Sequence, residues 1–181
     1  MAAYRKRNAD GPNSEDKALD LFAEMMIEKI ESIRKDWRKP WFTEGALPWP
    51  RNLHGREYNG MNALMLLLHC EKQGYTIPRF CTFDCVRRLN TPGKDGQELP
   101  RVSILRGEKS FPVMLTTFTC IHKETKEKIR YEDYKKLSEK EQELYNVFPK
   151  MQVFRVFNVA QTNLREARPE LWEKLEQEVT R

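Results

Sequence analysis

The sequence predicts an α+β fold, with a small and mostly antiparallel sheet and several packed helices in a single domain. Apolar residues recur every three or four positions over 14–37 and 61–68, which is the spacing of helices that bury one face. Apolar runs of strand length occupy 102–105, 112–121 and 151–159. A length of 181 residues suits one domain of this kind.

The N-terminal part is expected to contain one long helix. Residues 1–13 are expected to form a disordered basic tail, and Ser14 is the expected N-cap, because acidic Glu15 and Asp16 follow it in the first turn. Pro40 ends the helix, since proline cannot continue it. The expected buried stripe comprises Leu19, Phe22, Met26, Ile30, Ile33 and Trp37.

The stretch 47–68 joins a polar loop to an apolar helix. Pro48 and Pro50 restrict the backbone on either side of Trp49, and the Asn59–Gly60 pair supplies the turn into the helix. Gly74 is the expected C-cap.

Beyond Gly74 the sequence predicts short helices alternating with strands. A helix capped by Thr82 is expected to end at Leu89, and an exposed loop over 90–101 follows it. Strands 102–105 and 112–121 are joined by the turn 106–110, and a solvated turn covers 122–128. The rest comprises a charged helical stretch over 131–145 with a Ser138–Glu141 capping box, the strand 151–159 and a last helix over 169–179. The run 151–159 has apolar residues on both faces, so we expect a central strand. Asn158 and Gln161 are either satisfied structural amides or readers of base edges.

The charge distribution is compatible with an anionic partner such as nucleic acid. The chain has 32 Lys and Arg against 27 Asp and Glu, and residues 61–130 hold the excess, with 12 basic and 7 acidic side chains. A DNA-mimicking inhibitor is disfavoured, because such a protein is acidic. No apolar run is long enough for a membrane span and the N-terminus resembles no secretory signal, so a cytoplasmic location is expected.

The sequence offers little for catalysis or for a metal. His54, His69 and His122 are far apart, and neither a P-loop nor an H-E-x-x-H motif is present. Cys81 and Cys85, with His69 nearby, are compatible with a metal site, but their spacing favours reduced, buried thiols. We therefore expect no catalysis, no metal, no cofactor and no small-molecule substrate.

Aromatic and basic side chains gather in the segment 37–58. Indoles beside Arg and Lys are typical of surfaces that stack the bases of a single strand and bind its backbone. The same pattern is compatible with a small core that packs the loop on the first helix, or with a connection whose arginines lie along apolar surface. A second basic turn places Arg106 and Lys109 around Gly107.

Five sequence blocks, in this order, resemble the N-terminal domain of ArdC-type antirestriction proteins, which is shared with some TraC-type plasmid primases. The blocks are W-R-K-P-W (37–41), P-R-N-L-H-G-R-E-Y-N-G-M-N (50–62), G-Y-T-I-P-R-F-C-T-F (74–83), R-G-E-K-S-F-P-V (106–113) and V-F-N-V-A-Q-T (156–162). The resemblance implies an α+β domain at 14–165 that binds single-stranded DNA. It also implies a mobile element, such as a conjugative plasmid or transposon, whose incoming DNA the protein protects from host restriction. Residues 166–181 are then a C-terminal helix or the start of a linker.

Two features depart from the family pattern. Members usually carry a C-terminal zincin-like metallopeptidase domain with H-E-x-x-H, which is not found here, so the chain is expected to be either the N-terminal piece of a longer protein or a stand-alone copy. The loop 90–101 is also longer than expected before the R-G-E-K block.

The residue pattern and the resemblance favour the same DNA-binding side chains. We expect stacking by Trp41, Trp49 and Tyr58, phosphate binding by Arg51, Arg56, Arg106 and Lys109, and hydrogen bonding by Asn52 and Asn62, which alternatively pin the loop. This set requires the turn 106–109 to lie beside the loop 50–62. The alternatives are a protein-interaction module that docks a restriction or transfer-complex subunit through the same loop, and the regulatory part of a metallopeptidase that continues past Arg181.

Overall fold

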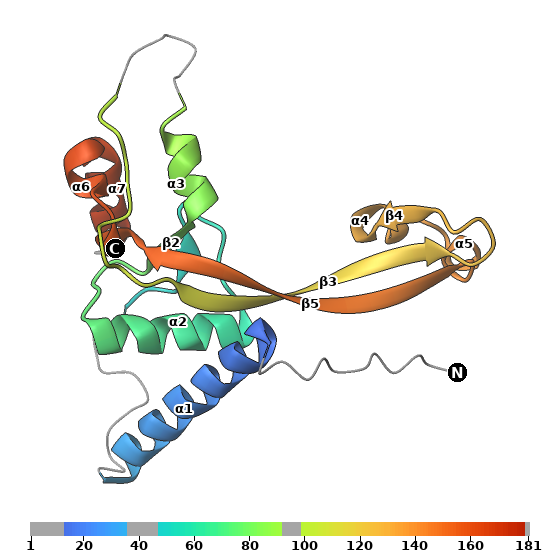
Figure 1. The fold of residues 1–181 in the computed structure, drawn as a ribbon, viewed down its shortest axis with the longest axis horizontal. Helices are drawn as coiled ribbons and strands as arrows, with labels where there is room; N and C mark the ends of the chain where they lie inside the picture. Colours follow the sequence, from blue (N-terminus) through green and yellow to red (C-terminus); the bar gives the residue numbers. More distant parts are fainter. Residues whose placement is uncertain (1–12, 36–46, 92–98, 180–181) are drawn as a thin grey trace. The chain divides into compact units, whose positions relative to one another are not determined.

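The structure is a computed structural model, and it describes residues 13–35, 47–91 and 99–179 (Figure 1). The chain divides into two compact units. The smaller unit takes its described residues from 1–18 and 114–153, and the larger unit takes its own from 19–113 and 154–181.

Five strands form one mixed sheet in the order β1-β2-β5-β3-β4. β1 (Arg51–Asn52) is parallel to β2 (Arg79–Thr82), and β2 is antiparallel to β5 (Tyr145–Asn158). β3 (Phe111–His122) is antiparallel to β4 (Lys128–Arg130), and β3 and β5 are neighbours that run in opposite directions (Figure 1). The predicted α+β class and mostly antiparallel sheet are therefore confirmed, and the run 151–159 lies largely in the central strand, as predicted.

The helices of the described residues are mostly short. They are α1 (Ser14–Lys35), α2 (Gly60–Gln73), α3 (Phe83–Leu89), α4 (Tyr131–Tyr134), α5 (Glu139–Gln142), the 3-10 turn η1 (Val159–Gln161), α6 (Leu164–Ala167) and α7 (Pro169–Val179). Three predicted caps are confirmed. Gly74 ends α2 in the left-handed region at φ 71°, the Thr82 hydroxyl accepts from the Cys85 amide at 3.1 Å, and Ser138 forms a capping box with Glu141.

The prediction for the first helix is wrong in two details. Asn13 rather than Ser14 is the cap, because its side-chain oxygen accepts from the amides of Glu15 and Asp16 at 2.9 and 2.8 Å. The buried positions are Ala18, Phe22 and Met25, whereas Leu19 and Ile30 of the predicted stripe are about half exposed. Apolar residues occur on two adjacent stripes of this helix, and periodicity alone does not choose between them.

The predicted strand 102–105 is also wrong, because only an isolated bridge between Ile104 and Thr162 forms there. The Asn90 side chain forms hydrogen bonds with both backbone groups of Val102. It accepts from the Val102 amide at 2.7 Å and donates to the Val102 carbonyl at 2.8 Å. A side chain therefore satisfies groups that a strand partner would otherwise pair.

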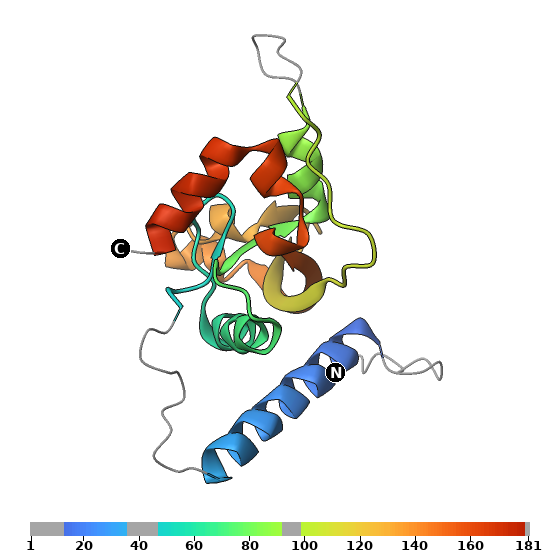
Figure 2. The same cartoon turned by 90° about the vertical axis from the view of Figure 1, so that its left-hand side faces the viewer.

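The two faces of β2 are covered by different helices. Phe80 pairs with Asn158, whose side-chain amide contacts the Cys70 sulfur of α2 at 3.9 Å. The next residue, Cys81, points to the other face and packs in a cluster that includes Leu164 and Leu175. The two cartoon views accordingly place α2 and α7 on opposite sides of β2 (Figures 1 and 2).

The smaller unit contains residues 114–122 of β3 and 145–153 of β5, together with β4, α4 and α5 (Figure 1). Phe118 stacks on Tyr131 with ring centroids 4.4 Å apart, and His122 meets the edge of Tyr145 at 5.0 Å. Leu115 and Phe148, by contrast, are about half exposed on their strands. This unit therefore has few fully buried apolar side chains.

His69 makes folding sensitive to acid. Its ring stacks on Phe111 at 4.3 Å, its Nε2 is buried without a partner among the described residues, and burial, aided by Lys72, lowers its pKa from 6.5 to about 4. Between pH 6.5 and 4, His69 is therefore protonated in the unfolded chain and neutral in the folded chain. We expect the free energy of unfolding to decline as pH falls from 6.5 to 4, measured by urea titration.

The variant His69→Phe keeps the aromatic ring on Phe111 and removes the titration. Its free energy of unfolding is expected to decline less over the same pH range than that of the unchanged protein. Parallel declines in the two proteins would show that His69 is not the group responsible.

Asn158 is expected to be a structural residue whose loss destabilises the fold. It is fully buried, donates to the Ile77 carbonyl at 2.9 Å and accepts from the Ala160 amide at 2.9 Å. Asn158→Ala leaves the buried Ile77 carbonyl and the Ala160 amide without this partner and should cost about 1–3 kcal/mol of stability by denaturant unfolding. Asn146→Ala, at an exposed position of the same strand, is the matched control and should change stability little.

Candidate nucleic-acid interface

The loop after β1 is held by its own backbone and by Asn52. The Asn52 amide donates to the Arg56 carbonyl at 2.8 Å, and the Tyr58 amide donates to the Pro50 carbonyl at 3.0 Å. The Asn52 side-chain oxygen accepts from the amides of His54 and Arg56 at 3.0 and 2.9 Å. Asn52 was predicted either to bind DNA or to pin the loop, and its contacts here pin the loop.

Trp49 and Tyr58 are joined at the base of this loop. The Trp49 indole N–H donates to the Tyr58 carbonyl at 2.6 Å, and the Trp49 side chain remains 47% exposed. Tyr58 meets the buried Phe80 ring edge-on, with centroids 6.2 Å apart. Burial raises the pKa of Tyr58 to about 12, so its phenol stays protonated at neutral pH. Trp49 thus offers an oriented aromatic surface, and the Tyr58 side chain packs against Phe80.

Two short segments supply arginines. In the loop, Arg51 pairs with Glu57 at 2.7 Å, while the exposed Arg56 has no ion-pair partner among the described residues. On α3, Arg87 and Arg88 share Asp84 at 2.6 and 2.8 Å and remain mostly exposed.

A cavity of about 230 Å³ separates the loop from α3. Its walls are residues 52–54 and Tyr58 of the loop, residues 80–82 of β2, and the side chains of Asp84, Cys85 and Arg88. Because β1 and β2 are parallel, their carboxyl ends lie at the same edge of the sheet, and the segments that follow them flank one hollow. Ligand sites of open sheets commonly occupy such positions.

The cavity contains a histidine–cysteine contact. The Cys85 sulfur lies 3.6 Å from His54 Nε2, and burial raises the pKa of the Cys85 thiol, with Arg88 opposing and Asp84 reinforcing the shift. A protonated thiol is a weaker nucleophile than a thiolate, so the raised pKa disfavours a nucleophilic role for Cys85. Among the described residues, no three or more His, Cys, Asp or Glu side chains are grouped to hold a metal.

The remaining predicted residues lie elsewhere. Asn62 is half-buried in the first turn of α2, and Trp41 lies outside the described residues. Arg106 and Lys109 are exposed in the turn before β3, where Gly107 adopts φ 89°. Gln161 fixes this turn by donating to the Glu108 carboxylate at 2.8 Å and to the Lys109 carbonyl at 2.9 Å. The structure therefore assembles the loop residues, and the adjacency of the turn 106–109 stays a prediction.

The contacts of Asn158 and Gln161 decide between their two interpretations. Both side chains are buried and bonded to protein groups, so they are structural amides. Sequence reasoning did not include His54, Arg87 and Arg88 among the site residues. The available signal for the two arginines was the predicted short helix that Thr82 caps, since it exposes Arg87 and Arg88.

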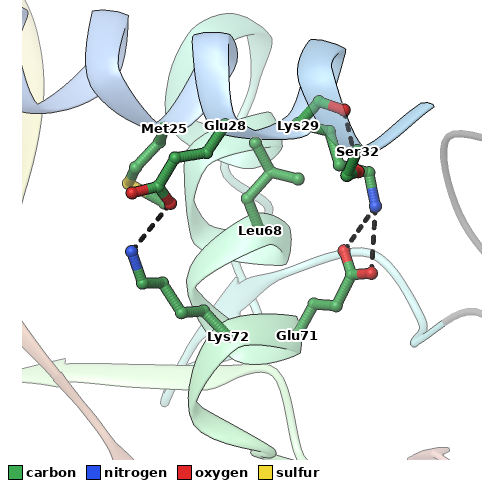
Figure 3. Close-up of a pocket in the computed structure, with 7 residues that line it drawn as sticks. All are labelled: Met25, Glu28, Lys29, Ser32, Leu68, Glu71 and Lys72. Carbon is green, nitrogen blue, oxygen red and sulfur yellow. Dashed lines mark hydrogen bonds and ion pairs between the residues drawn. The ribbon is translucent and has the colours of Figure 1, made fainter. Parts of the chain in front are cut away.

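A second hollow, between α1 and α2 in the larger unit, is a weaker candidate for a nucleic-acid site (Figure 3). Lys29 pairs with Glu71 at 2.7 Å and Lys72 with Glu28 at 2.8 Å across it, and the figure shows both pairs bridging the two helices. The charges compensate each other, so the hollow presents no excess of either sign.

Comparison with known families identifies the chain. The family model of the N-terminal domain of anti-restriction factor ArdC matches residues 16–157, which is most of the sequence. The chain belongs to this family. The ArdC N-terminal domain is not a known catalytic domain. No relative among the curated proteins matches. No helix of the described segments is both long and apolar enough to cross a membrane.

Two solved structures are similar to this ArdC N-terminal domain. They are the metal-free and the Mn(II)-bound crystal structures of the antirestriction ArdC protein from R388 plasmid, each 22% identical in sequence. The matches cover 80% and 79% of this chain, with TM-scores of 0.48 and 0.44. The chain spans only about two fifths of the ArdC protein, 42% and 40% in the two comparisons.

Asn52→Ala is expected to loosen the loop. The substitution leaves the amides of His54 and Arg56 without their shared acceptor, so their hydrogen exchange should accelerate and the domain should lose about 1 kcal/mol of stability. Asn59→Ala is the matched control, because Asn59 is exposed and its side chain makes no capping bond to α2. Unchanged exchange at both amides would contradict the role given to Asn52.

Proposed function

We propose that this domain binds single-stranded DNA without catalysis, through the loop 49–58 and the arginine-bearing side of α3. The observation that carries the proposal is the state of Trp49, whose indole is oriented by a 2.6 Å hydrogen bond and yet half exposed, on a segment that also carries Arg51 and Arg56. Aromatic platforms flanked by cationic side chains are the usual means of holding a single strand, with stacking worth about 1–3 kcal/mol per base.

The charge on this surface supports an anionic ligand. Arg51, Arg56, Arg87 and Arg88 outnumber the acidic Glu57 and Asp84, which already pair with three of them. A phosphate chain that binds here meets positive charge and releases condensed counterions. Affinity should therefore fall as the salt concentration rises.

The rigidity of the loop also supports binding. Five hydrogen bonds within residues 50–58 involve Asn52 or close the loop, so its backbone is held in place before a ligand arrives. A preformed surface avoids the entropy cost of ordering a flexible loop on binding.

We propose that the bound strand belongs to a mobile element and that binding contributes to antirestriction in the cytoplasm. The family name supports this role, and the R388 relative is itself called an antirestriction protein. In a longer protein, a C-terminal metallopeptidase domain is the proposed partner of this module.

A second candidate function, docking of another protein, is favoured by the smaller unit. Leu115 and Phe148 are 48% and 51% exposed there, and Met151 is 37% exposed. Exposed apolar side chains on the strands β3 and β5 are the observation that favours an interaction surface. Binding to such a partner would depend little on salt, which distinguishes it from binding to DNA.

Arg56→Ala and Trp49→Ala are expected to weaken single-strand binding in different ways. Anisotropy of labelled oligo-dT, compared with the matching duplex across a salt series, measures both. A plot of the logarithm of the binding constant against the logarithm of the salt concentration has a negative slope. Arg56→Ala should reduce the magnitude of this slope by about 0.7, the value for one phosphate contact in a single strand. Trp49→Ala should cost about 1–3 kcal/mol and leave that slope nearly unchanged. Lys109→Ala tests the turn 106–109 in the same assay.

Lys174→Ala is the control for charge, because Lys174 is exposed on α7 and its loss changes the net charge equally. An equal effect of Lys174→Ala and Arg56→Ala would indicate general attraction rather than a site. Absence of binding to oligo-dT at low salt, by a protein shown to be folded, would reject the DNA proposal.

A further inference from the structure

We propose that the cavity between the loop 52–58 and α3 receives one nucleobase of the bound strand, turned out of line with its neighbours. This inference rests on the proposed function and assigns a specific role to the hollow at the ends of β1 and β2. The surrounding arginines would hold the backbone, and the cavity would hold the base.

The size of the cavity suits a single planar group. Its volume of about 230 Å³ is below the roughly 300 Å³ at which sites for larger organic ligands begin. The rings of Tyr58 and Phe80 form part of its wall, and an unstacked base commonly packs against such aromatic side chains.

The polar groups of the cavity match the edge of a base. The Tyr58 hydroxyl has no hydrogen-bond partner among the described residues, and its protonated state makes it a donor to a base carbonyl or ring nitrogen. Asp84 supplies a carboxylate that Arg87 and Arg88 hold in place, and this carboxylate retains lone pairs to accept from an amino or imino N–H. Donor and acceptor thus come from opposite walls, the loop and α3.

The connection between the cavity and Trp49 supports a continuous path for the strand. Tyr58 lines the cavity, and its carbonyl accepts from the Trp49 indole. A base stacked on the exposed Trp49 and a base in the cavity would therefore be held by directly bonded residues. Arg88 lines the same cavity and is 77% exposed, which leaves its guanidinium accessible to the phosphate of the inserted nucleotide.

The alternative that the cavity belongs to a redox or metal site is weaker. The neutral Cys85 thiol and His54 are in contact, but the described residues provide no third ligand grouped with them. Cys81 forms another part of the wall, and burial raises its pKa to about 12, so it too is a thiol.

The test compares two probes on three proteins. The probes are oligo-dT and a strand of the same length made of abasic deoxyribose phosphates, which retains the phosphates and lacks every base. The proteins are the unchanged domain, Tyr58→Phe and Cys85→Leu, which adds bulk to the cavity from α3. Circular dichroism and thermal unfolding establish that each variant is folded.

Tyr58→Phe should weaken binding to oligo-dT by roughly 3- to 10-fold, the equivalent of one hydrogen bond, and leave binding to the abasic strand unchanged. Cys85→Leu should show the same selectivity with an effect at least as large. Tyr145→Phe makes the same chemical change in the smaller unit and should affect neither probe.

The outcomes separate the two proposals. If the unchanged domain binds neither probe, the proposed function fails and this inference fails with it. If the domain binds oligo-dT but the folded Tyr58→Phe and Cys85→Leu proteins bind it equally well, DNA binding stands and the base cavity is rejected. Equal weakening of both probes by either variant would likewise reject it, because a base site cannot affect a strand that has no bases.

Discussion

The short parallel pairing of β1 with β2 is the constraint on which the rest of the site depends. The Arg51 amide donates to the Pro78 carbonyl at 3.0 Å, and the Leu53 amide donates to the Phe80 carbonyl at 2.9 Å. These bonds fix the direction of both strands, so the loop and α3 leave the same edge of the sheet. β2 is itself held on its other side by β5. The loop therefore rests on the central part of the sheet, and its exposed side chains acquire a fixed position from a strand only two residues long.

Amide side chains hold much of the irregular backbone of the larger unit. Asn52 binds two amides of its loop, Asn90 binds both backbone groups of Val102, and Asn158 binds the Ile77 carbonyl. Each asparagine offers a donor and an acceptor, so one side chain can replace the partner that a neighbouring strand would supply. This arrangement allows a small sheet to carry long connections whose buried polar groups are satisfied.

The ion pairs distribute charge differently in two regions of the larger unit. Across the hollow between α1 and α2 the charges are matched in pairs, whereas on the loop and α3 each carboxylate is outnumbered by arginine. A carboxylate shared by two arginines orients both guanidinium groups and leaves positive charge in excess. Burial raises the pKa of the Cys81 and Cys85 thiols near this surface, which favours their protonated form.

The sequence by itself determined the class of fold, most of the helices, the caps at Gly74 and Thr82, and the central place of the run 151–159. These follow from local periodicity and capping chemistry, which are written in neighbouring residues. Only the tertiary structure decided which stripe of α1 is buried, that Asn90 replaces a strand partner at 102–105, and that the loop 52–58 meets α3 around a cavity. These features depend on contacts between residues far apart in the chain, such as the pairing of Phe80 with Asn158, and such contacts leave no periodic trace in a single sequence.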